Sequence, residues 1–525
     1  MRMEIRRIIL RRVFLSLSGL SVLALAAAVG IQPPNVPNNL KLPEGQMVLL
    51  KAVGQGVQIY ACSAKAGDPT QFEWVLKAPE ADLMDTRGRG SANITAGQPE
   101  KLTTAARWWV RCSNAPKLPV QWPNTKASNI SFQVFSKSTG RTVFGPAEIS
   151  SIFSGVPGAC GSGPDYTDPV ALYDKAAGRW LVTILASSDG FKTGFECFAV
   201  SITSDATGSY NRYAFSFSPN LNDDPKFGVW PDAYYGSYNM FSASAFLGAK
   251  VCAYSRGAML AGKTALSICF QRPTSDFTLL PSDLDGHTAP PAGEPNFLLE
   301  LATSTTLNLF KFHVDFTTPA NSTFTGPTML TVPSFTEACA ATGTCIPQPG
   351  TTQRLDSLGD RMMFRLVYRK FASHEALVAT HSEKTSAAAS GVRWYEIRNP
   401  NTSPTVFQRG TVTAGSTSLW MGSIGMDKVG DIALGFSESS SSLHPAVAYI
   451  GRVPTDPPGT MESIDVTFKG NGSQTSSLSR WGDYSSVSID PSDDCTFWYA
   501  NEYIPSNGIF NWHTRLNSFK FTSCK

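Results

Sequence analysis

Alternating apolar and polar positions recur along most of the chain, and they follow one repeated pattern. The pattern is an apolar alternating run, an Asp, a short turn and a second apolar run. It occurs in VALYDKAAGRWLVTIL (170–185), SIGMDKVGDIALGFS (423–437) and SVSIDPSDDCTFWYA (486–500). A hydrophobic period of two is that of a half-buried strand, so each segment predicts a β-hairpin. The Asp that opens each turn can accept backbone N–H groups, and these residues are Asp174, Asp427 and Asp490.

Repeated hairpins of this kind predict an all-β repeat fold. Helical periodicity is confined to short pieces such as RGAMLAGK (256–263). One propeller blade takes ~40–50 residues, so residues 128–525 favour a β-propeller of seven blades, with six to eight compatible. An array of β-sandwiches is the alternative, but sandwiches rarely repeat one Asp hairpin in each unit.

The N-terminus predicts an export signal. Residues 1–28 hold a basic start, an apolar run from Val13 and small residues suited to cleavage. An uncleaved anchor is the alternative, although the apolar run is short for the ~20 residues of a bilayer span. We therefore expect a secreted protein, extracellular or periplasmic, with no membrane span once the signal is removed. A Pro- and Asn-rich linker follows at 29–40.

Residues 41–90 predict a small partial β domain, and residues 91–127 break its pattern. The latter segment is poor in strand alternation. A one-base frame shift would turn the TGGTGG codons of Trp108 and Trp109 into Val-Val codons. Residues 91–127 are therefore interpreted as an irregular, frameshift-derived or fused segment, with a genuine divergent loop as the alternative.

Ten cysteines in an exported chain favour disulfides over metal ligands. Proximity in sequence predicts four pairs: Cys160 with Cys197, Cys252 with Cys269, Cys339 with Cys345, and Cys495 with Cys524. Cys112 is then accidental, and Cys62 lacks an evident partner. No metal site is expected, because the six His show no ligand spacing. No cofactor is expected either, apart from a structural calcium ion that the acidic turn at 490–494 could hold.

Two stretches resemble known families of secreted bacterial proteins. Residues 36–90, with VPNNLKLPEG and FEWVLKAPEADLMDTRG, resemble the first half of a small domain family of unknown function. Residues 128–525, with QRLDSLGDRMMFRLVYR and RWGDYSSVSIDPSDDCTFWYANEY, resemble a family without assigned activity. The second resemblance implies an exported propeller-like domain and brings no substrate. The family has a more acidic turn at GSGPDYTDP, which leaves a role for Asp165 in doubt.

Candidate site residues are those expected where the inner strands of a propeller begin, near the mouth of its central tunnel. The carboxylates and cations are Asp168, Asp232, Arg354, Asp356, Arg480 and Asp483. The aromatic candidates are Trp230, Trp420, Trp481 and Tyr484. Such a set could bind a sugar, or supply paired carboxylates for glycoside cleavage. Arg–Asp pairs that merely tie blades together are the structural alternative.

The chemistry predicts an extracellular binding protein with carbohydrate or a surface glycan as ligand. The alternatives are a sialidase-like hydrolase or lyase using carboxylates at the tunnel mouth, and a structural or adhesive surface protein without a small ligand. A net charge of +3 gives no indication of a nucleic-acid partner. No nucleophile elbow or P-loop is present. A monomer is expected.

Overall fold

A computed structural model describes residues 53–65, 68–84, 90–94, 106–112, 130–386 and 389–525, with side chains from 130 onward. The predicted signal peptide and linker lie outside these residues. The chain divides into two compact units, Met1–Thr103 and Thr104–Lys525. Among the described residues, no helix is long and apolar enough to cross a membrane.

The first unit holds one antiparallel sheet. Its strands are β1 (Val53–Lys65), β2 (Asp68–Met84) and β3 (Gly90–Ile94), in that order. β1 and β2 pair along almost their whole length. The third strand was not expected, because it lies largely beyond residue 90, where the sequence pattern breaks.

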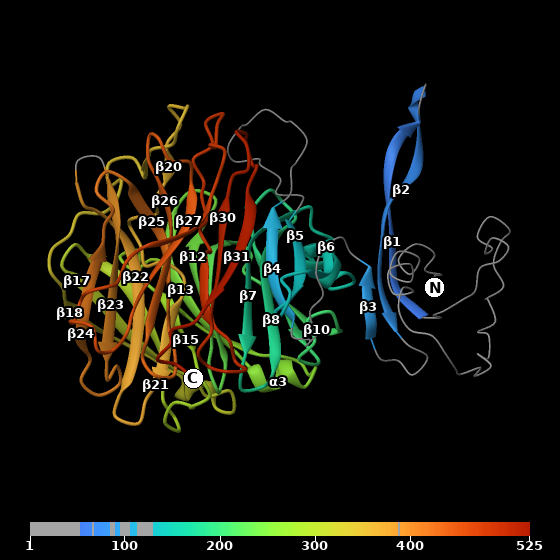
Figure 1. Cartoon of the computed structure of the whole chain (residues 1–525). Helices are drawn as coiled ribbons and strands as arrows, with labels where there is room; N and C mark the ends of the chain where they lie inside the picture. The colour runs from blue at the N-terminus through green and yellow to red at the C-terminus, as the bar shows by residue number, and fades with distance from the viewer. Residues whose placement is uncertain (1–52, 66–67, 85–89, 95–105, 113–129, 387–388) are drawn as a thin grey trace, which may run out of the picture. The chain divides into compact units, whose positions relative to one another are not determined.

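The second unit consists of successive sheets whose strand pairs are mostly antiparallel (Figure 1). The first sheet holds β4 (Ala106–Cys112), β5 (Ile130–Ser136) and β6 (Thr142–Glu148). The next holds β7 (Asp165–Asp174), β8 (Arg179–Ser187), β9 (Phe195–Ser201) and β10 (Tyr210–Ser216). The third holds β11 (Leu221–Val229), β12 (Tyr234–Phe241), β13 (Phe246–Tyr254) and β14 (Ser267–Gln271). β4 lies inside the segment predicted to be irregular, and it pairs with β5 along its length.

An eight-stranded sheet follows, in which β15 and β21 pair in parallel. One half holds β15 (Leu280–Leu284), β16 (Asn296–Thr303), β17 (Thr306–His313) and β18 (Thr323–Thr331). The other half holds β21 (Leu366–Lys370), β22 (Glu375–Lys384), β23 (Ser390–Arg398) and β24 (Thr405–Val412). Between the halves lie the short paired strands β19 (Thr344–Ile346) and β20 (Leu355–Asp356).

Two further sheets end the chain. The first holds β25 (Ser418–Met426), β26 (Ile432–Ser439), β27 (Ala446–Arg452) and β28 (Asp465–Lys469). The second holds β29 (Ser486–Ile489), β30 (Phe497–Tyr503) and β31 (His513–Phe519). The helices are short: η2 (Ile149–Phe153), α2 (Ala159–Ser162), α3 (Arg256–Leu260) and η3 (Pro319–Asn321). The prediction of an all-β protein is confirmed.

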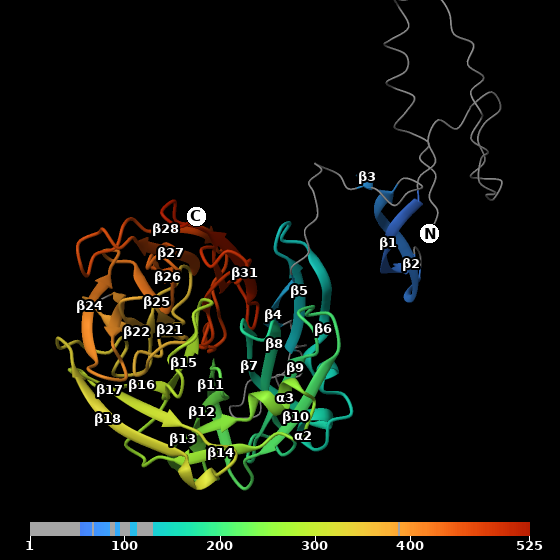
Figure 2. The same ribbon diagram turned by 90° about the horizontal axis from the view of Figure 1, so that it is seen from below.

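The sheets of the second unit form a closed circuit (Figure 2). The inner strands contact one another in succession, in the order β4, β7, β11, β15, β21, β25 and β29. β31 of the last sheet contacts β4 of the first. This radial order is propeller-like, and it turns the starts of the inner strands toward a common centre.

Three inner strands share one backbone irregularity. Asp168, Asp224 and Met421 are each the fourth residue of their strand, in β7, β11 and β25, and each has a positive φ of 52–53°. The pairing register shifts at the same place in all three strands. Asp tolerates this left-handed conformation better than most residues. Equivalent bulges therefore place Asp168 and Asp224 at the same level of neighbouring strands.

The prediction that an Asp carboxylate accepts backbone N–H groups in each hairpin turn is confirmed. Asp174 Oδ1 accepts the Ala177 N–H at 3.0 Å, and Asp427 Oδ1 accepts the Val429 N–H at 2.9 Å. Asp490 Oδ1 accepts the Ser492 N–H at 2.9 Å. The Asp carboxylate thus accepts hydrogen bonds from turn N–H groups that have no carbonyl partner in the sheet.

All four predicted disulfides are present: Cys160–Cys197, Cys252–Cys269, Cys339–Cys345 and Cys495–Cys524. The side chains of Cys62 and Cys112 lie outside the described part of the chain. Four disulfides fit a protein that folds in an oxidising, extracellular compartment.

Candidate functional site

An acidic cluster forms where the inner strands begin. Asp168 of β7, Asp223 and Asp224 of β11, and Asp483 before β29 lie close enough to perturb one another's ionisation. All four are partly exposed, yet burial raises the pKa of Asp168, Asp223 and Asp483. Partial exposure together with a pKa raised by desolvation indicates carboxyl groups that lie in a recess, where water solvates them incompletely. These four residues are called the acidic cluster below.

Asp224 is held in its ionised form. Burial alone would raise its pKa, but Lys226 and Arg361 beside it hold the pKa below the usual range. Lys226 Nζ donates to Asp224 Oδ1, and Arg361 donates to Asp224 Oδ2 at 2.9 Å. Two cations on one carboxylate make this residue a structural anchor.

Asp168 has the opposite environment. Burial raises its pKa to about 7, and the negative charges of Asp223 and Asp224 add to the effect. Asp168 Oδ1 accepts a hydrogen bond from the Thr167 hydroxyl, at 3.0 Å. Burial, followed by Asp224, also raises the pKa of Asp223. Asp168 can therefore hold a proton at neutral pH while Asp224 cannot.

Arg480 and Asp483, both predicted site residues, form an ion pair at the edge of the cluster. Asp483 raises the pKa of Arg480, and Asp168 and Asp356 contribute further. Burial nevertheless raises the pKa of Asp483, even though Arg480 lowers it. Arg480 thus places a positive charge near the carboxylates of β7 and β11.

Two glutamates extend the acidic cluster. Burial raises the pKa of Glu502, on β30, to about 8, and its Oε1 accepts the Gly482 N–H at 2.9 Å. Glu196, on β9, is fully buried and accepts a hydrogen bond from Asn222 at 3.0 Å. Burial and the charge of Asp168 raise its pKa well above the usual range. The site thus holds several carboxyl groups poised to be neutral near pH 7.

Sequence reasoning missed Asp223, Asp224, Lys226, Arg361 and both glutamates. The DDPK motif is visible in the sequence, but the candidates predicted from DDPKFGVWPD are Trp230 and Asp232, at the other end of that segment. Glu502 stood in the ANEY segment without a signal, because only the pairing of β29 with β30 brings it beside Gly482.

The structure brings together Asp168, Arg480, Asp483 and Tyr484 from the predicted set, with Asp356 nearby. Asp356 Oδ1 accepts the Leu358 N–H at 2.9 Å, and its own N–H donates to Ser479. Tyr484 lies beneath Lys226, whose Nζ is 4.0 Å from the ring centroid.

The three predicted tryptophan platforms are core residues instead. Trp230 is 1% exposed, packs edge-on against Tyr368 and donates to the Glu294 carbonyl at 3.0 Å. Trp420 and Trp481 are 0% and 1% exposed, with ring centroids 5.8 Å apart. None of them offers a face on which a sugar could stack.

Asp232 and Arg354 are not part of the acidic cluster. Asp232 follows β11 at the end opposite Asp224, and its carboxylate accepts the Tyr235 hydroxyl. Arg354 is exposed, directly before β20.

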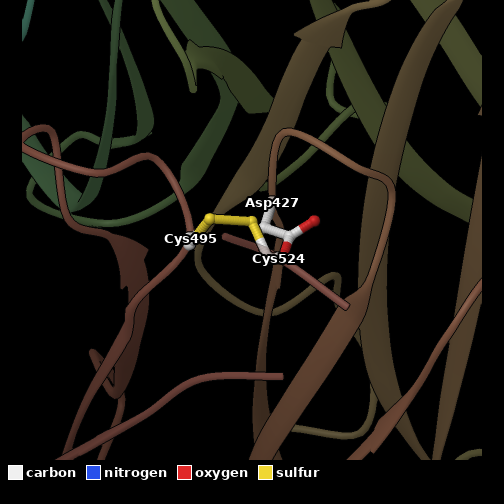
Figure 3. A group of neighbouring side chains, drawn as sticks. All are labelled: Asp427, Cys495 and Cys524. Atoms are coloured by element: carbon white, nitrogen blue, oxygen red, sulfur yellow. A yellow bond between two sulfur atoms is a disulfide. The ribbon is translucent and has the colours of Figure 1, made fainter. Parts of the chain in front are cut away.

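Few described side chains are arranged as metal ligands. One group of three brings its ligand atoms within 4.8 Å: Asp427, Cys495 and Cys524 (Figure 3). The two sulfurs are bonded to each other, so they are not thiolate ligands. In the acidic turn at 490–494, Asp490 accepts from Trp498 and Lys137, and Asp494 accepts from Arg369. Those carboxylates already have protein partners.

Comparison with known proteins gives a short family match. Residues 43–137 match a family model described as Protein of unknown function (DUF3455). The match extends past residue 90, where the sequence pattern predicted the resemblance to end, and runs through the segment interpreted as frameshift-derived. Whether that segment is a frameshift scar stays a prediction. No curated protein matches the chain.

Solved structures match at low similarity. A protein of unknown function from Dyadobacter fermentans DSM 18053 has a TM-score of 0.32 at 10% identity, over 68% of this chain and 79% of its own. The α-L-arabinofuranosidase from Lactobacillus brevis has a TM-score of 0.30 at 10% identity, over 68% of this chain and 91% of its own. The endo-arabinase from Bacteroides thetaiotaomicron VPI-5482 has a TM-score of 0.28 at 11% identity, over 58% of this chain and 95% of its own. At these scores neither fold detail nor activity is transferred.

Proposed function

We propose that this chain is a secreted seven-bladed β-propeller that binds carbohydrate at the acidic cluster. Seven blades follow if the eight-stranded sheet counts as two, β15–β18 and β21–β24, and if the three-stranded first and last sheets count as one each. The predicted signal peptide and the disulfides support export.

The observation that carries the proposal is the mixture of carboxyl states at one recessed place. A neutral carboxyl group both donates and accepts hydrogen bonds, whereas an ionised one only accepts. Burial raises the pKa of Asp168 to about 7 and that of Glu502 to about 8, whereas Lys226 and Arg361 hold the pKa of Asp224, near Asp168, below its usual range. Adjacent sugar hydroxyls need donors and acceptors side by side, and Arg480 adds fixed donors.

A glycan array probed with the full exported protein tests this proposal. Asp168→Ala and Asp483→Ala should lose the signal, while Asp232→Ala, at the other end of the strands, should keep it. Melting curves of all three variants separate loss of binding from loss of fold. Equal signals from the cluster variants and the wild type would overturn the proposal.

Glycoside hydrolysis is the second candidate, and the raised pKa values of Asp168 and Glu502 favour it. A general acid must be protonated at working pH while a partner carboxylate stays ionised. Release of reducing sugar from array-positive glycans is the test. In a hydrolase, Asp168→Asn or Glu502→Gln should abolish turnover while binding persists.

The third prediction, a structural or adhesive protein, is favoured by the burial of all three tryptophans. If these assays detect neither glycan binding nor sugar release, the structural or adhesive function is the one that remains. Size-exclusion chromatography with light scattering tests the expected monomer.

A further inference from the structure

A surface depression lies beside the last two sheets. It has a volume of about 580 Å³, within the range of small-molecule sites. Its lining residues are Pro349, Gly350, His444, Asn471, Ser506 and Asn507. This region is called the outer depression below. None of its residues belongs to the acidic cluster, and His444 is the single titratable group among them.

The outer depression lies at the same end of the strands as the acidic cluster. β25 and β29 begin at that end, because Met421 and Asp483 mark the starts of inner strands. In an antiparallel sheet, β26 and β30 run back to the end where β25 and β29 began. The β26–β27 loop with His444 and the β30–β31 loop with Asn507 therefore lie at that end.

Two glycines allow these loops to pack closely. A Cβ at Gly472 would lie 2.2 Å from the Ser506 carbonyl carbon, and one at Gly470 would lie 2.5 Å from the Pro445 oxygen. Such distances are far below van der Waals contact, so side chains are excluded at both positions. The loops that line the depression are thereby held in place.

The hydrogen bonds of Ser473 fix the protonation pattern of His444. The Ser473 hydroxyl donates its one proton to the Pro349 carbonyl at 2.8 Å. It must then accept from His444 Nδ1, which lies 2.9 Å from Ser473 Oγ. His444 thus carries its proton on Nδ1, and Nε2 is a hydrogen-bond acceptor without a partner among the described residues.

Asn507 is oriented by the same residue. Its Oδ1 accepts the Ser473 N–H at 2.8 Å, which leaves its NH₂ group as a donor on the other side. Ser473 thereby sets a fixed acceptor on His444 and a fixed donor on Asn507. An uncharged ligand with adjacent hydroxyl groups matches this arrangement.

The outer depression is joined to the acidic cluster through Gln474. Its side-chain NH₂ donates to the Arg480 carbonyl at 2.5 Å, while its backbone N–H donates to Gln348 at 2.8 Å. Gln474 directly follows Ser473, and Arg480 pairs with Asp483. One short hydrogen-bonded segment therefore connects both regions.

We propose that the outer depression binds a neutral sugar unit of the same oligosaccharide whose other part occupies the acidic cluster. The inference rests on the proposed function and narrows it: the ligand is an extended chain with an uncharged unit at His444 and Asn507. Longer oligosaccharides then bind more tightly than short ones, because they reach both places.

Calorimetric titration of the full protein with gluco-, galacto- and xylo-oligosaccharides of one to six units tests the inference. In the wild type, one series should gain about tenfold in affinity once its length spans both regions. His444→Ala and Asn471→Ala should lose that gain but keep the affinity for the shorter members. His287→Ala is the matched control, because His287 lies at the opposite end of the strands, against Pro491.

The outcomes separate the two proposals. A length-dependent gain that survives in His444→Ala and Asn471→Ala overturns the outer site but leaves the acidic cluster in place. If Asp168→Ala leaves every affinity unchanged while His444→Ala weakens binding, the proposed function fails and the outer site stands alone. Absence of binding by all three series overturns the inference.

Discussion

The ammonium group of Lys226 lies 4.0 Å above the ring centroid of Tyr484, and it also pairs with Asp224. Lys226 belongs to β11, and Tyr484 precedes β29, so this contact joins segments more than 250 residues apart in sequence. The lysine side chain is 3% exposed. It therefore holds the acidic cluster together from within.

Replacing Lys226 by Met should destabilise the protein strongly. The change leaves Asp224 with Arg361 and the Thr278 hydroxyl, and it removes the cation from the Tyr484 ring. Breaking a buried ion pair costs about 3 kcal/mol or more in unfolding free energy. Urea unfolding followed by tryptophan fluorescence measures it. Lys520→Met is the control, because its pair with Asp493 is exposed and should cost under about 1 kcal/mol. Equal stability of Lys226→Met and the wild type would contradict this account.

The sequence predicted well what is decided locally. Asp427 and Asp490 opened the predicted turns, and the disulfides join cysteines 6 to 37 residues apart. Sheet packing decided the rest. Nothing local to Trp481 shows that its indole points into a core, where it donates to Ser437 at 2.9 Å. Glu502 reaches Gly482 only through strand pairing, which no short motif specifies.

Carbohydrate binding should weaken as the pH rises from about 6 to 9. The pKa values of Asp168 and Glu502 are raised to about 7 and about 8, so both groups are neutral donors at pH 6 and ionise through this range. Glu502→Gln keeps a neutral donor at all pH values and should flatten the alkaline part of the profile. Titration of an array-positive glycan at several pH values measures this. A wild-type affinity independent of pH would contradict the assignment.

Acid should stabilise the fold through Asp427 and Asp431. Both side chains are fully buried, and Asp431 accepts a hydrogen bond from Ser523. Burial, with the charge of Asp431, raises the pKa of Asp427 to about 7. The folded protein then keeps a proton that the unfolded chain has already released between pH 4 and 7. The unfolding free energy from this group therefore falls as the pH rises through that range.

Asp427→Asn removes this proton uptake. Its stability should fall less steeply between pH 4.5 and 6.5, by up to about 1.4 kcal/mol per pH unit, the linkage of one proton. Urea unfolding at several pH values gives the slopes. Asp205→Asn, in an exposed turn, should keep the wild-type slope. An Asp427→Asn slope as steep as that of the wild type would rule out the buried proton.

The C-terminal disulfide should stabilise more than the shortest one. Cys495–Cys524 spans 29 residues and Cys339–Cys345 spans 6. Loop-closure entropy then gives about 3.5 and about 2 kcal/mol, respectively. Unfolding of the two double Cys→Ser variants compares them. A larger loss from the 339–345 pair would show that chain entropy does not set the order.

The most direct test of the central proposal is the affinity of the full protein for an array-positive glycan, measured by calorimetry with the wild type, Asp168→Ala, Asp483→Ala and Asp232→Ala. The account predicts at least a thirtyfold loss, about 2 kcal/mol, in both cluster variants and no change in Asp232→Ala. Folded cluster variants that bind as tightly as the wild type would contradict it.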